Sequence, residues 1–169
     1  MSEDQIEVRK RLFVKSLSAF QKTASKLLRF DQLNTYNDLE LEKYDALGAR
    51  FTRVYECAIK LFRAKDIVDS LETAVSYRDL LHKMERFGWI SDIEIWNDIK
   101  IVRNKLNHEY LPSEQESIYN FIIDISLKIQ FRKDKILMLT DIEIAQEAKM
   151  KKITDIAEGL GIDADDLEQ

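Results

Sequence analysis

The sequence contains very little glycine, proline, cysteine and histidine. Its 169 residues include four Gly, one Pro, one Cys and two His. Because sheets and long loops need Gly and Pro at their turns, this scarcity favours long helices joined by short connections. The single cysteine, Cys57, excludes an intramolecular disulfide. Neither cysteines nor histidines cluster at the spacing of zinc ligands, so we expect no metal and no cofactor.

Long apolar runs are also missing. No stretch approaches the roughly 18 apolar residues that a membrane-spanning helix needs. The sequence MSEDQIEVRKR at the start is charged and lacks the apolar stretch of a signal peptide. We therefore expect a cytoplasmic protein that does not contact a membrane.

The net charge of −5 is unevenly distributed along the chain. Residues 153–169 contain six acidic residues and no Lys or Arg, which leaves 26 basic and 25 acidic residues in residues 1–152. The body of the protein is therefore close to neutral. Its overall acidity does not exclude RNA as a partner.

Apolar residues recur at spacings of three, four and seven, as is typical of amphipathic helices. This spacing predicts one long helix over residues 4–29 and a second over residues 39–69. Four signatures with Ser or Thr followed three residues later by Asp or Glu are expected to open further helices. They are SYRD (76–79), SDIE (91–94), SEQE (113–116) and TDIE (140–143).

These elements predict an all-α protein, an up-and-down bundle of four to five helices. Gly88 is expected to end the short helix that follows Ser76. We expect residues 1–139 to form the bundle. Residues 140–169 are expected to form a polar C-terminal helix followed by the acidic tail.

The helix expected from residue 92 carries apolar residues on two faces. Ile93 and Trp96 point about a third of a turn or more away from the expected core face. An exposed tryptophan would be unfavourable in a monomer, so we expect Ile93 and Trp96 to lie at a dimer interface. A core position for Trp96 is the alternative. The residues expected to face the core are Ile95, Ile99, Val102 and Leu106.

The same helix leads into the polar sequence RNKLNHEY, residues 103–110. A histidine such as His108 can carry a proton near neutral pH, and an arginine such as Arg103 can stabilise charge on a phosphate. Without a metal, this pair suits RNA cleavage by the 2′-hydroxyl. One chain supplies one suitable histidine, and a dimer would supply two. The alternative is a solvated helix end, where cations interact favourably with the helix dipole.

RNKLNHEY resembles the R-x4-H-x-Y motif of HEPN-domain proteins, in particular HepT-like toxins paired with MNT-type minimal nucleotidyltransferase antitoxins. The sequences RFTRVYECAIKLF (50–62) and SYRDLLHKMERFGW (76–89) resemble the same family, and the resemblance covers roughly residues 5–137. It implies a HEPN-like helical homodimer that acts as a metal-independent endoribonuclease, with its active site across the dimer interface.

The resemblance also implies roles for individual residues. Arg103 and His108 match the catalytic pair, and Asn104 matches the polar residue after the arginine. Tyr110 matches the tyrosine that the antitoxin adenylylates to silence the toxin. Some related proteins only bind a nucleotidyltransferase, so a non-catalytic regulatory subunit is the alternative function.

Overall fold

The computed structural model describes residues 3–70, 72–106 and 112–129, and these residues form helices and no strand. The predicted all-α class is confirmed. The helix expected from Thr140 and the boundary between residues 139 and 140 lie outside the described residues. The helices are α1 (Glu3–Ala24), α2 (Asp38–Asp69), α3 (Tyr77–Arg86), α4 (Ile93–Leu106) and α5 (Pro112–Lys128).

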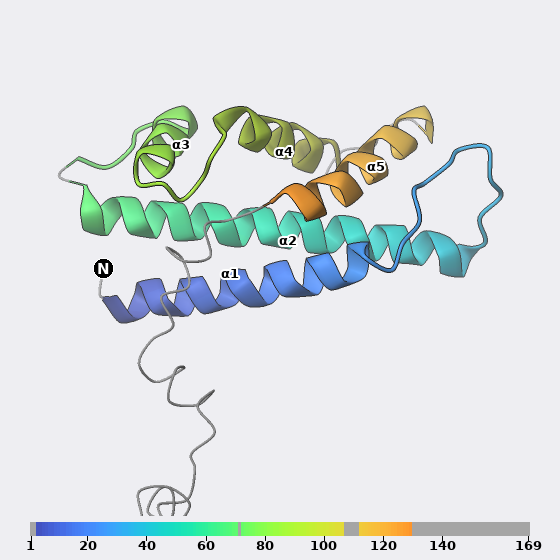
Figure 1. Ribbon diagram of the computed structural model, residues 1–169, viewed down its shortest axis with the longest axis horizontal. Helices are drawn as coiled ribbons and strands as arrows, with labels where there is room; N and C mark the ends of the chain where they lie inside the picture. The colour runs from blue at the N-terminus through green and yellow to red at the C-terminus, as the bar shows by residue number, and fades with distance from the viewer. Residues whose placement is uncertain (1–2, 71, 107–111, 130–169) are drawn as a thin grey trace, which may run out of the picture. The chain divides into compact units, whose positions relative to one another are not determined.

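The two long helices form the frame of the bundle. α1 and α2 run antiparallel and side by side, whereas α3, α4 and α5 follow one another along a different side of α2 (Figure 1). α5 also contacts α1. The apolar faces of all five helices meet in one continuous core. None of the helices in the described segments is long and apolar enough to cross a membrane.

α1 ends five residues before its predicted end. The backbone N–H groups of Lys26 and Leu27 donate to carbonyls three residues earlier, which tightens and ends the helix. Phe30 then lies in the core, 4% exposed. Its backbone N–H donates to Asn120 Oδ1 (2.8 Å), and its carbonyl accepts from Asn120 Nδ2 (2.9 Å). This pairing with α5 turns the chain out of the helical path.

The ends of α3 agree with the sequence prediction. Ser76 and Asp79 form the expected capping box at its start. Gly88 follows its end with a φ of 69°, which favours glycine. The N–H of Gly88 donates to Glu85 O and that of Trp89 to Met84 O, both at 2.8 Å. This is a Schellman motif, and it directs the chain sharply toward α4.

The start of α4 corrects a prediction. The SDIE signature indicated Ser91 as the capping residue, but the helix begins at Ile93. The side chain of Asp92 accepts the backbone N–H of Glu94 at 2.8 Å. Aspartate is as good an N-cap as serine, so two adjacent candidates compete and the spacing alone does not decide between them.

The expected interface role of Ile93 and Trp96 is wrong, because both are buried within the chain itself. They are 9% and 5% exposed. The Trp96 ring lies with its centroid 4.9 Å from that of Phe62 on α2, and its backbone carbonyl accepts the Tyr77 hydroxyl at 2.9 Å. α3 packs beside α4 and covers this face, so the alternative core position of Trp96 is confirmed. Dimerism stays a prediction.

A glycine allows the C-terminal end of α4 to approach α2 closely. A Cβ atom at Gly48 would lie 3.3 Å from Leu106 Cδ2. Glycine within a helix costs about 1 kcal/mol relative to alanine, and here its small size makes room for Leu106. This contact positions the last turn of α4, which carries the start of the polar cluster.

Candidate functional site

Only the first half of the polar cluster lies within the described residues. Arg103 and Asn104 occupy the last turn of α4, Ile93–Leu106. His108 and Tyr110 lie outside the described residues. The surroundings of Arg103 therefore define the part of the candidate site that can be described.

Arg103 is held against α2 by charge and by an aromatic ring. Its Nη2 donates to Glu56 Oε1 at 2.9 Å, and its guanidinium lies 5.8 Å from the centroid of the Tyr55 ring. The Arg103 side chain is 29% exposed and that of Glu56 is 44% exposed. Because exposed ion pairs contribute only about 0–1 kcal/mol, Glu56 orients Arg103 without locking it.

Arg103 keeps donor capacity beyond this pair. Its Nε is buried and has no hydrogen-bond partner among the described residues. Its Nη1 makes a long hydrogen bond of 3.4 Å to Oδ1 of Asn104, whose side chain is exposed. The Arg103 side chain is partly exposed, so its Nη donors, rather than the buried Nε, are the ones that can bind the oxygens of a phosphate group.

Two partly buried tyrosines, Tyr55 and Tyr77, lie next to these polar groups. The hydroxyls of Tyr55 on α2 and Tyr77 on α3 are close enough for each to influence the pKa of the other. Burial raises the pKa of Tyr55, although Tyr77, Arg103 and Arg63 act in the opposite direction. Burial and the neighbouring Tyr55 also raise the pKa of Tyr77. Both tyrosines are therefore neutral at physiological pH and unsuited to act as general bases.

Further positive charge lies near Tyr55 and Tyr77. Lys100 Nζ lies 4.3 Å from the centroid of the Tyr77 ring, and Arg63 is close enough to lower the pKa of Tyr55. Together with Arg103, three cations from α2 and α4 gather around the Tyr55–Tyr77 pair. Cations next to aromatic rings, with exposed amide groups nearby, form surfaces that suit a phosphodiester.

The sequence analysis missed Glu56 and Tyr77 as part of the candidate site. Glu56 is 47 residues away from Arg103 along the chain, and no local spacing connects the two. Tyr55 is partly buried against the core. The signal that could have found Glu56 is its place next to Tyr55, at the edge of the apolar stripe of α2.

His82 is exposed on α3, and Cys57 packs partly buried against the core. Within residues 3–70, 72–106 and 112–129, no three His, Cys, Asp or Glu side chains are grouped so that they could hold a metal ion.

Comparisons with known proteins indicate which family the chain resembles. The chain is 28% identical over 86 residues to a curated protein from Haemophilus influenzae described as a probable ribonuclease HepT. The match covers 48% of this chain and 59% of that protein, so the chain spans little more than half the length of the curated relative. No family model and no solved structure matches. The similarity confirms the predicted resemblance to HepT-like HEPN proteins.

Proposed function

We propose that this HepT-like chain is a metal-independent endoribonuclease of the toxin type. One observation carries the proposal: Arg103 is oriented by Glu56 and Tyr55 at the end of α4, directly before the sequence that supplies Asn104, His108 and Tyr110. The similarity to a protein described as a probable ribonuclease HepT supports RNA as the substrate. The proposed ligand of Arg103 is the phosphate at the bond that is cleaved.

In the proposed reaction, a base removes the proton from a ribose 2′-hydroxyl, and the oxygen attacks the adjacent phosphorus. The bond from phosphorus to the 5′-oxygen breaks, and an acid protonates the leaving oxygen. The products are a 2′,3′-cyclic phosphate and a 5′-hydroxyl. Arg103 stabilises the charge that develops on the phosphoryl oxygens, which is a large contribution in sites of this kind.

The acid and the base are proposed to come from two copies of the chain. His108 is the one histidine of the polar cluster. The other histidine of the chain, His82, lies on α3 and is exposed. Two chains that bring their α4 ends together would supply two histidines and two arginines. We further propose that an MNT-type nucleotidyltransferase acts as the antitoxin and silences the site by adenylylating Tyr110.

Analysis of the RNA ends tests this mechanism. Purified protein is incubated with a defined single-stranded RNA in EDTA, and the fragment ends are identified by mass spectrometry. We expect 2′,3′-cyclic phosphate and 5′-hydroxyl ends. Fragments with 3′-hydroxyl and 5′-phosphate ends, or cleavage only after a divalent metal is added, would contradict the mechanism. A dimer with unmodified Tyr110 that cleaves no RNA would favour the non-catalytic subunit.

Replacing Glu56 tests how Arg103 is oriented. In Glu56→Gln the ion pair becomes a weaker hydrogen bond from Arg103 to a neutral acceptor, so we expect kcat to fall about 2- to 5-fold, as the loss of up to about 1 kcal/mol predicts. KM for RNA should not rise, because the variant removes a negative charge next to the phosphate site. Glu42→Gln, at an exposed position of the same helix, is the matched control. A higher KM with unchanged kcat would contradict this role.

A further inference from the structure

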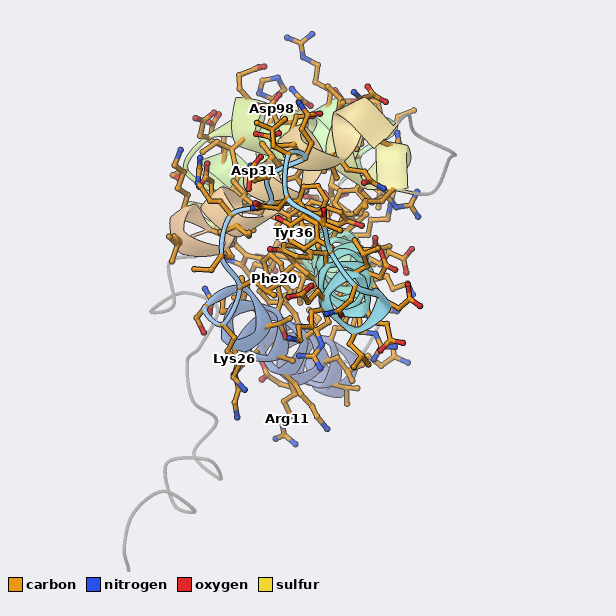
Figure 2. The ribbon with its side chains drawn as sticks, turned by 90° about the vertical axis from the view of Figure 1, so that its right-hand side faces the viewer. Arg11, Phe20, Lys26, Asp31, Tyr36 and Asp98 are labelled. Atoms are coloured by element: carbon orange, nitrogen blue, oxygen red, sulfur yellow. The ribbon has the colours of Figure 1, made fainter. Side chains whose placement is uncertain are left out.

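From Arg9 onward, α1 carries positive charge without any acidic residue. Residues 9–29 contain seven Lys or Arg and no Asp or Glu. Arg11, Lys15 and Lys22 fall within roughly 40° of one another around the helix and are exposed. Figure 2 shows Arg11 extending away from the bundle, whereas Phe20 of the same helix points into it. Lys26, just after the helix, extends to the same outer side (Figure 2).

The neighbouring side of α2 is also positive. Arg50, Arg53 and Lys60 are exposed there, and Arg50 Nη1 donates to the carbonyl of Ala19 on α1 at 3.1 Å, so the two rows of cations adjoin. The stretch 43–65 contains two acidic residues, and both are engaged elsewhere. Asp45 accepts the Tyr119 hydroxyl and Glu56 accepts Arg103, each at 2.9 Å.

We call these six residues the α1–α2 basic face: Arg11, Lys15, Lys22, Arg50, Arg53 and Lys60. Of the residues described, no acidic side chain forms an ion pair with Lys15, Lys22, Arg53 or Lys60. The chain as a whole has a net charge of −5. A one-sign surface on an acidic protein creates a local positive potential, which attracts a polyanion.

We propose that the α1–α2 basic face binds the sugar-phosphate backbone of the RNA outside the cleaved bond. This inference rests on the proposed function, which supplies RNA as the ligand. The face is continuous with the candidate site along α2. Lys60 and Arg63 are neighbours on that helix, and Arg63 acts on Tyr55, whose ring lies next to Arg103.

A protein partner fits the basic face less well than RNA. Lysine is depleted in protein interfaces, whose centres are apolar and low in charge. Phosphate contacts, in contrast, come mainly from Arg and Lys and need no fixed sequence. Val8 and Leu12, each 55% exposed on α1, are the apolar residues that a protein partner would use instead.

Salt-dependent RNA binding tests the proposal. Binding of a fluorescently labelled single-stranded RNA is measured by anisotropy in a His108→Ala background, which prevents cleavage during titration. The test variant combines Lys15→Gln, Lys22→Gln and Arg53→Gln. The control combines Arg78→Gln, Arg86→Gln and Lys128→Gln, which remove the same charge from exposed positions on α3 and α5.

We expect the test variant to lower the slope of log K against log salt by about 2, because each lost phosphate contact contributes about 0.7. Its affinity at about 0.1 M salt should fall roughly 10- to 100-fold, while the control stays near wild type. Equal effects of the two variants would overturn the proposal, as would the absence of RNA binding.

Two further outcomes would overturn the assignment of the face to RNA phosphates. One is that Val8→Ser with Leu12→Ser weakens RNA binding as much as the test variant, because apolar contacts would then contribute as much as the cations. The other is that poly-L-glutamate binds, depends on the same three cations, and competes fully with RNA.

RNA cleavage by the chain with native His108, measured separately, distinguishes the proposed basic face from the proposed ribonuclease function. Cleavage that the test variant leaves unchanged would overturn the basic face alone, whereas face-dependent binding without cleavage would overturn the ribonuclease alone.

Discussion

Arg103→Ala is expected to lower RNA cleavage about 10²- to 10³-fold, the usual cost of removing a group that stabilises transition-state charge. The loss should appear mainly in kcat, because the other cations near the site, Lys100 and Arg63, still attract the RNA. The fold should remain, since the Arg103–Glu56 pair is partly exposed and contributes only about 0–1 kcal/mol to stability.

Two comparisons make this prediction specific. Arg103→Lys keeps the charge but loses the planar fork of donors, so we expect it to recover only part of the activity. Arg78→Ala removes an exposed arginine of α3 that makes none of the Arg103 contacts described above, and should cleave like wild type. Single-turnover cleavage with saturating protein gives the rates, and circular dichroism confirms the helical content. An Arg103→Ala rate equal to that of Arg78→Ala would remove Arg103 from the mechanism.

Asp66→Ala is expected to destabilise the fold by about 3–5 kcal/mol, because it leaves the largely buried Lys83 without its carboxylate partner. Asp66 is 3% exposed near the end of α2. Its carboxylate accepts hydrogen bonds from Lys83 Nζ (2.8 Å), Ser70 Oγ (2.7 Å) and the Ala74 backbone N–H (2.6 Å). One side chain thus joins α2, the segment after it, and α3. Urea denaturation gives the free energy of unfolding.

The matched control for Asp66 is Asp69→Ala. Asp69 lies three residues further on and pairs with Lys65 on the surface of the same helix. Removing such a pair should cost less than about 1 kcal/mol. A difference between the two variants smaller than this would contradict the account of Asp66 as the group that holds α3 to α2.

The same carboxylate predicts how stability depends on pH. Burial raises the pKa of Asp66, but the hydrogen bonds from Ala74, Lys83 and Ser70 and the charge of Lys83 outweigh it, so its pKa lies below the ordinary value of 3.8. The folded state therefore releases this proton more readily than the unfolded state. Its contribution to stability is fully present above pH 3.8 and is lost as the pH falls further. Asp66→Asn should abolish this part of the acid dependence.

Helix positions were predictable because they depend on local patterns. The spacing of apolar residues predicted both long helices, and the Ser76–Asp79 box and Gly88 predicted the ends of α3. The start of α2 was predicted only from apolar spacing. Its capping box uses Asn37 with Glu40, whereas only Ser and Thr signatures had been considered. Where the chain leaves α1 depends on Asn120, which no pattern near residue 24 reveals.

The surroundings of the site were less predictable because they depend on which helices meet. An angular argument on α4 alone assigned Trp96 to a partner, but Phe62 and Tyr77 from other helices cover it. Arg103 was selected by its residue type and Asn104 by the resemblance to the HEPN motif, and neither selection depends on packing. Glu56, by contrast, joins Arg103 only through the packing of α4 against α2.

The most direct test of the central claim compares purified protein and its His108→Ala variant on total RNA in EDTA. His108→Ala removes the proposed proton carrier, a contribution of about 10²- to 10⁴-fold, while a dimer measured by light scattering should persist. The account predicts that the protein with His108 cleaves the RNA and that the variant does not. Equal cleavage by both proteins would contradict it.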